Sequence, residues 1–198
     1  MAQNQALPID VNRKVRKTAF VRLPNSELRA REYLTPDEME RLIAAAKDTR
    51  YGLRDSTMLL TIYRHGLRAQ ECCDLEWSAV DWNHRVKGGK STVHPIRGDE
   101  LRALRKLLRE TNDGRFMFMT ERGGPFTADN LNKLVKRLGA GIFDFPIHVH
   151  MIRHACGFKL ANDGHDTRAL QDYLGHRSIS STVRYTELSA TKFKDFWR

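Results

Sequence analysis

HMIRHACGFKLANDGHDTRALQDYLGHRSISSTVRYT, residues 150–186, is the stretch that decides the fold. It holds four polar side chains at fixed intervals: His150, Arg153, His176 and Tyr185. A phenol can attack phosphorus, a guanidinium can hold two phosphate oxygens, and an imidazole can donate hydrogen bonds or move a proton. A second arginine lies far upstream, in the run HGLRAQE. So many polar groups exceed the needs of an ordinary core and indicate chemistry on a phosphodiester, such as cutting and rejoining DNA.

The intervals are similar to those of the tyrosine recombinase (phage integrase) family, and within it to the short fimbrial phase-switch invertases. The family's first arginine stands in G-L-R-x-x-E, which is matched from Gly66 to Glu71. In H-x-x-R, Arg153 follows His150 by three residues. The histidine of L-G-H, His176, follows Arg153 by twenty-three residues, and Tyr185 follows His176 by nine. The resemblance runs from Tyr33 to Trp197. It implies the family's catalytic-domain fold.

The resemblance also implies a role for each residue. Tyr185 would be the nucleophile that forms a 3′-phosphotyrosyl link and frees a 5′-hydroxyl, so religation needs no ATP. Arg68 and Arg153 would clamp the non-bridging oxygens and stabilise the pentavalent transition state, with neither metal nor cofactor. His150 would act as general base or orient the phosphate, and His176 would be a second phosphate donor.

The proton for the leaving oxygen comes, in this family, from a lysine on a β-hairpin. The candidate is Lys87 in VKGGKSTVHPI, with Lys90 as the alternative. Only nineteen residues separate Arg68 from Lys87, fewer than family members usually have, and the shortening falls at 81–86. The sequence therefore predicts truncated strands or a lost strand, and a damaged hairpin would slow cleavage while leaving DNA binding intact.

Other polar residues receive weaker interpretations. His154 is interpreted as a structural histidine, and Glu71 as a residue that orients Arg68 or supports its helix. A zinc site is the competing interpretation of H-x-H-x3-H-x-C, but it lacks a recognised catalytic frame and leaves Tyr185 unexplained. Five histidines have no assigned role: His65, His84, His94, His148 and His165.

Composition agrees with a nucleic-acid partner. Lysine and arginine number 34 against 24 aspartates and glutamates, giving a net charge of +10, and such an excess favours a polyanion. No apolar run approaches the ~20 residues of a membrane span, and MAQNQALPID has no signal pattern. We therefore expect a cytoplasmic, nucleoid-associated bacterial protein. Three cysteines in apolar helical contexts are expected to be reduced packing residues.

The chain is predicted to be mainly α with a small antiparallel β-sheet. Residues 1–33 would form a basic flexible arm, and 34–198 the catalytic domain, without an N-terminal core-binding domain. A capping box is predicted at Thr35–Glu38. Helices are expected near 36–46, 54–66, 101–108, 127–138, 148–162 and 166–174, with a short helix leading to Tyr185 and the sheet within 77–96.

The leading hypothesis is a site-specific recombinase that inverts a promoter segment controlling fimbrial or surface genes. Its partners would be duplex DNA with inverted repeats, further copies of itself in a tetrameric synapse, and DNA-bending accessory proteins. One alternative is a catalytically impaired regulatory protein with the same fold, and another is a nicking and relaxing enzyme. A final helix carrying Phe193, Phe196 and Trp197 would either dock on a neighbouring protomer or pack on its own domain.

Overall fold

The structure is a computed structural model that describes residues 31–82, 86–87, 93–111 and 114–187. The chain divides into two units, Met1–Arg31 and Glu32–Arg198, and the described helices and strands belong to the second. Most of the expected arm, the turns at Asn83–His84 and Gly88–Gly89, Lys90 and the expected C-terminal aromatic helix lie outside the described residues.

The described part of the chain is predominantly helical, as predicted, and the small antiparallel sheet is also present. The elements in order are α2 (Pro36–Lys47), α3 (Gly52–His65), α4 (Ala69–Cys73), the 3₁₀ turn η1 (Trp77–Ala79), β1 (Val80–Asp81), β2 (Val86–Lys87), β3 (His94–Pro95), α5 (Gly98–Glu110), α6 (Ala128–Ala140), α7 (Val149–Asn162), α8 (Thr167–Leu174) and α9 (Ser180–Glu187).

Local sequence signals explain where the helices begin and end. The Thr35 hydroxyl accepts from the Glu38 amide, and the Glu38 carboxylate accepts from the Thr35 amide, which confirms the predicted capping box. Helix α3 ends at Gly66, whose φ of 59° is left-handed backbone that favours glycine. Since the chain turns there, Arg68 comes directly before α4, as predicted.

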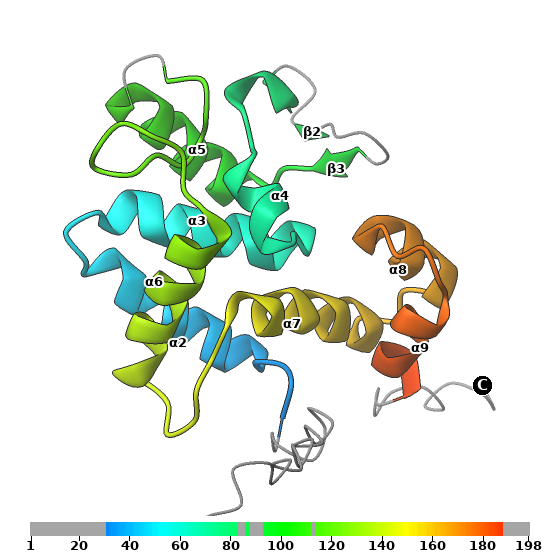
Figure 1. Cartoon of the computed structure of the whole chain (residues 1–198). Coiled ribbons are helices and arrows are strands. Elements are labelled where there is room, and N and C mark those ends of the chain that lie inside the picture. Colours follow the sequence, from blue (N-terminus) through cyan, green and yellow to red (C-terminus); the bar gives the residue numbers. More distant parts are fainter. Residues whose placement is uncertain (1–30, 83–85, 88–92, 112–113, 188–198) are drawn as a thin grey trace, which may run out of the picture. The chain divides into compact units, whose positions relative to one another are not determined.

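Helix α7 contacts the helices α2, α3, α6, α8 and α9. Helices α8 and α9 lie at its C-terminal end and contact each other (Figure 1). Most residues of α7 are buried, Ile152 and Ala155 among them. The polar side chains of α7 that are buried therefore have pKa values shifted by burial.

The sheet keeps three antiparallel strands in the order β1-β2-β3. Within the described residues each of the three strands has two residues, and β2 is bordered on both sides by residues outside the described part. Lys87 pairs with Val80 on one side and with His94 on the other. Among the described helices, none is long and apolar enough to cross a membrane.

Candidate active site

Arg153 lies in the middle of α7 and is only 2% exposed. Its Nη1 donates to the Gly66 carbonyl and its Nη2 donates to the Leu174 carbonyl at 2.6 Å. The guanidinium therefore joins the end of α3 to the end of α8. A Cβ at Gly66 would lie 2.4 Å from the Leu174 side chain, so glycine is required here by contact as well as by its backbone angle.

Glu71 holds the two arginines together. It accepts from the backbone amide of Arg68 at 2.8 Å and from its Nη1 at 2.5 Å, and it lies 3.8 Å from Nη1 of Arg153. Burial would raise the pKa of Glu71, but these hydrogen bonds and the two positive charges outweigh it and lower the pKa. An ionised Glu71 thus lies beside both guanidinium groups and fixes their separation.

Tyr185, on α9, is turned into the protein and is 1% exposed. Its hydroxyl lies 2.7 Å from Nδ1 of His154, and its ring packs edge-on against Phe158 with centroids 5.1 Å apart. A Cβ at Gly157 would lie 2.7 Å from the tyrosine ring. The small residue at Gly157 therefore makes the space that the ring occupies.

His176 and His150 lie nearer the surface. Nδ1 of His176 lies 2.8 Å from the Thr182 hydroxyl, and a hydroxyl that donates to Nδ1 places the proton of neutral histidine on Nε2, ready to meet a phosphate. The His176 ring stacks at 6.1 Å from that of Tyr185. The exposed His150 packs edge-on against His154 with centroids 4.3 Å apart.

The histidines of this site have pKa values below the usual value for histidine. Burial lowers the pKa of His154 to about 3, helped by His150 and Arg184, and lowers that of His176 to about 4, helped by Arg153. Partial burial, followed by Arg153 and Arg184, lowers the pKa of His150. His154 and His176 are therefore neutral at pH 7 in the free protein.

Tyr185 is held in its neutral form as well. Burial raises its pKa to about 12, against the opposing influence of Arg153 and Arg184. A neutral phenol is a weak nucleophile, so any attack through this hydroxyl would require a base. The free protein thus stores its tyrosine in an unreactive state.

Residues 32–192 match the phage integrase family. The chain belongs to the phage integrase family. This recombinase is 38% identical to the Type 1 fimbriae regulatory protein FimE of Escherichia coli K12, over 84% of this chain and 91% of FimE. FimB of the same strain is also 38% identical, over 84% of this chain and 90% of FimB. Tyrosine recombinase XerC of Bacillus subtilis is 32% identical, over 86% of this chain and 61% of XerC.

Solved structures agree on the fold. The crystal structure of XerA recombinase has a TM-score of 0.70 at 27% identity, over 83% of this chain and 62% of that chain. XerH bound to its difH substrate gives 0.69 at 20% identity, over 84% of this chain and 53% of that chain. The predicted fold class and family are thereby confirmed. Family membership makes this chain a tyrosine-type, site-specific DNA strand transferase, and the catalytically impaired alternative is not favoured.

The recombinase brings five of the six predicted site residues together: Arg68, His150, Arg153, His176 and Tyr185. Arg68, His150 and His176, here called the outer residues, are at least partly open to solvent. Arg153, His154 and Tyr185, here called the inner residues, are buried. Lys87 is placed only by its backbone in β2, since its side chain lies outside the described part.

The sequence interpretation missed the part played by His154. It was expected to brace its helix, but the structure places it against the Tyr185 hydroxyl. The available signal was spacing: His154 follows His150 by four residues and therefore shares its helix face. The structure gives the zinc interpretation no support from Cys156, whose Sγ donates to the Arg64 carbonyl at 3.7 Å. Among the described residues, no group of three His, Cys, Asp or Glu could hold a metal ion.

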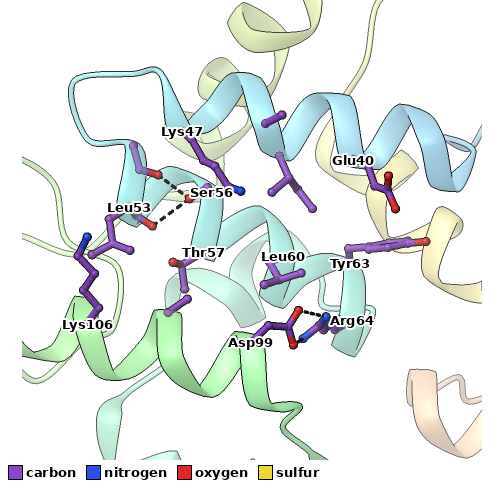
Figure 2. A pocket seen from close by; sticks show the side chains of 14 residues that line it. Glu40, Lys47, Leu53, Ser56, Thr57, Leu60, Tyr63, Arg64, Asp99 and Lys106 are labelled. Atoms are coloured by element: carbon purple, nitrogen blue, oxygen red, sulfur yellow. Dashed lines mark hydrogen bonds and ion pairs between the residues drawn. The ribbon is translucent and has the colours of Figure 1, made fainter.

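A groove of about 680 Å³ lies away from these residues, between α2, α3 and α5. Figure 2 shows its lining, with Arg64 and Asp99 joined at one end. Ser56 and Thr57 face it from α3, and Lys47 and Lys106 from the flanking helices (Figure 2). None of the predicted site residues lines it, so this groove is separate from the candidate active site.

Proposed function

We propose that this recombinase inverts a promoter-bearing DNA segment by cleaving and rejoining strands at inverted repeats, with Tyr185 as nucleophile. The observation that carries the proposal is the convergence of Arg68, Arg153, His176 and Tyr185 of one chain around Glu71 and α7. The FimE and FimB relatives, over nearly their whole length, support a fimbrial switch as the target. The proximity of Tyr185 to arginines of its own chain favours attack in cis.

In the proposed reaction, the Tyr185 oxygen bonds to phosphorus while the bond from phosphorus to the 5′-oxygen breaks. Arg68 and Arg153 hold the two non-bridging oxygens, whose negative charge grows in the transition state. His150 takes the phenol proton, His176 donates to the phosphate from Nε2, and Lys87 gives a proton to the 5′-oxygen. Reversal of these steps by a 5′-hydroxyl from another strand completes the exchange.

The closed arrangement of Tyr185 supports an additional step before attack. The hydroxyl must exchange His154 for the scissile phosphate, and α9 must move for the ring to leave its place against Gly157. An arriving phosphate adds negative charge beside His150 and His176, which raises the pKa of both imidazoles and equips them to hold or move protons. DNA binding would thus release the Tyr185 hydroxyl from His154 and favour protonation of His150 and His176.

The proposal extends to the partners and the setting of the reaction. The partners are duplex DNA with inverted-repeat sites, further copies of the chain in a tetrameric synapse, and DNA-bending accessory proteins. The protein would act in the bacterial cytoplasm, on the nucleoid. Support comes from the net charge of +10, which suits a polyanionic partner, and from the DNA-bound structures with which the fold is shared.

Covalent trapping tests this function. The protein is incubated with nicked duplexes that carry one inverted repeat, without metal or ATP, and a denaturing gel is examined for a protein–DNA band. We expect a band with the wild type and none with Tyr185→Phe, whose DNA affinity stays nearly unchanged because the hydroxyl acts mainly in the transition state. A band that persists in Tyr185→Phe, or retarded DNA with no covalent band in the wild type, contradicts the proposal.

A further inference from the structure

A second cluster of histidines lies outside the active site and is buried. His65, His94 and Glu100 are 2%, 5% and 0% exposed. Nε2 of His65 lies 3.0 Å from Oε1 of Glu100, and Nδ1 of His65 lies 3.3 Å from Nδ1 of His94. The His94 ring stacks on Tyr173 with centroids 4.0 Å apart. Buried polar groups are costly unless they are paired, so this network fixes its members relative to one another.

The charge of Glu100 is balanced within the cluster. Its Oε2 has no hydrogen-bond partner among the described residues, but Nη1 of Arg64 lies 3.7 Å away. Arg64 in turn binds Asp99 through both terminal nitrogens, at 2.7 and 2.5 Å (Figure 2). The contact between Nε2 of His65 and Oε1 of Glu100 needs one proton, and the contact between the two Nδ1 atoms needs another. Loss of either histidine therefore breaks a chain of contacts that ends at a buried carboxylate.

The cluster joins the segments that carry the proposed catalytic groups. His65 is the last residue of α3 and precedes Gly66, whose carbonyl holds Arg153. His94 begins β3 and is paired in register with Lys87. Tyr173 lies in α8, one residue before Leu174, whose carbonyl also holds Arg153. The turn after His65, strand β3 with its partner β2, and the end of α8 are thus all connected to the cluster of His65, His94 and Glu100.

The short sheet makes such an anchor necessary. The outer strands β1 and β3 have two residues each, β2 has two described residues, and Pro95 in β3 has no N–H to donate. A sheet this small has too few ladder bonds to hold its own position, since even hairpins of ordinary length are marginal in isolation. His94 is the residue of β3 that is both paired with β2 and tied into the core.

We propose that His65, His94 and Glu100 form a positioning network that fixes strand β2, and with it Lys87, against the Arg68 turn. The inference rests on the proposed function, in which Lys87 protonates the leaving oxygen. His65 and His94 act through the strand and do not touch DNA. Their loss should therefore impair protonation of the leaving group more than any other step.

The test compares an oxygen and a sulfur leaving group. In the usual nicked duplex, the bond to the 5′-oxygen breaks and that oxygen needs a proton; in a 5′-phosphorothiolate duplex the sulfur leaves as a thiolate without one. We expect His94→Leu, which keeps the size but loses both nitrogens, to slow covalent-complex formation on the oxygen substrate by about tenfold or more, which is part of the roughly 10²–10⁴-fold that a general acid contributes. On the sulfur substrate it should match the wild type, as Lys87→Ala should.

Two further variants separate positioning from stability. His94→Asn keeps a polar nitrogen near the place of Nδ1 and should recover part of the rate on the oxygen substrate. Leu104→Ala, in the core on α5, should lower the melting temperature while changing the rates on the two substrates by the same factor. The proposal is overturned if His94→Leu slows both substrates equally, or if it slows neither.

Failure of the network can be told apart from failure of the proposed function. Should the wild type form no Tyr185-dependent adduct with either substrate, the function itself is wrong. When the wild type is active and sulfur rescues Lys87→Ala but not His94→Leu, only the positioning network is wrong. A Lys87→Ala variant that sulfur does not rescue removes Lys87 as the acid, and the network proposal falls with it.

Discussion

The outer and inner residues of this active site differ in how ready they are for DNA. The side chain of Arg68 is 49% exposed and can meet a phosphate directly, whereas Tyr185 is 1% exposed and bonded to His154. In the proposed mechanism, Arg68 of the phosphate clamp is therefore accessible before DNA arrives, while Tyr185 is not. While its hydroxyl is bonded to His154, Tyr185 cannot attack a phosphodiester that binds only briefly or in the wrong place.

Arg153 is an inner residue that also belongs to the proposed phosphate clamp, and its loss should have the largest effect. Arg153→Lys should lower the cleavage rate by ~100-fold or more, because an ammonium cannot hold two oxygens in a planar fork. It should also lower the free energy of unfolding by about 1–3 kcal/mol, since the Gly66 and Leu174 carbonyls lose their donor. Single-turnover cleavage and urea unfolding measure the two effects.

Arg68→Lys is the matched control for that comparison. Its side chain is half exposed, so the free energy of unfolding should change by less than about 1 kcal/mol while cleavage falls steeply. If both variants lose the same stability, the distinction between outer and inner residues is wrong. A loss of cleavage below tenfold in Arg153→Lys would remove that residue from the phosphate clamp.

Gly157→Ala should displace the Tyr185 ring from its buried position. The added Cβ would lie within 3.0 Å of three ring atoms of Tyr185, so the ring must move, and overpacking of this kind costs about 1–3 kcal/mol. We expect a lower melting temperature and a Tyr185 phenol that titrates nearer its usual pKa in a spectrophotometric titration. Gly139→Ala overpacks against Ile147 instead. It should lower the melting temperature and leave the phenol unchanged, and the same phenol shift in both variants would speak against the storage site.

A smaller effect is expected from pH. His154 and His176 have pKa values of about 3 and 4 in the fold, below the 6.5 of the unfolded chain. Below pH 6.5 the unfolded state therefore binds more protons, and stability is lost as pH falls towards 4. Between pH 7.5 and 5.0 the buried His154 should cost about 2 kcal/mol in the free energy of unfolding, and the more exposed His176 should cost less because solvent screens its charge.

Urea unfolding at the two pH values checks this loss. His154→Gln should remove more than half of the pH dependence attributed to the pair, because only the more exposed His176 then remains. His165→Gln, which changes an exposed histidine, should leave it as in the wild type. An unchanged pH dependence in His154→Gln would show that His154 is not buried as described.

Much of the fold and most of the site could be predicted from sequence, for identifiable reasons. The capping box at Thr35 and the glycine stop at Gly66 are local signals, and the interval from His176 to Tyr185 spans only a short turn and part of α9. The His154–Tyr185 bond could not be predicted, because it depends on how α9 folds back on α7. The cluster of His65, His94 and Glu100 likewise joins residues 29 and 35 positions apart, and no local pattern connects them.

The state of the Tyr185 phenol tests the central claim most directly. Protein labelled with ¹³C at the tyrosine ζ carbon would be followed by NMR, with the Tyr185 signal assigned by its absence in Tyr185→Phe. The account predicts a signal that does not titrate up to pH 11 in the free protein, consistent with a pKa of about 12, and that moves when an intact inverted-repeat duplex binds. A signal that titrates near pH 10 without DNA, or stays in place at saturating DNA, would contradict it.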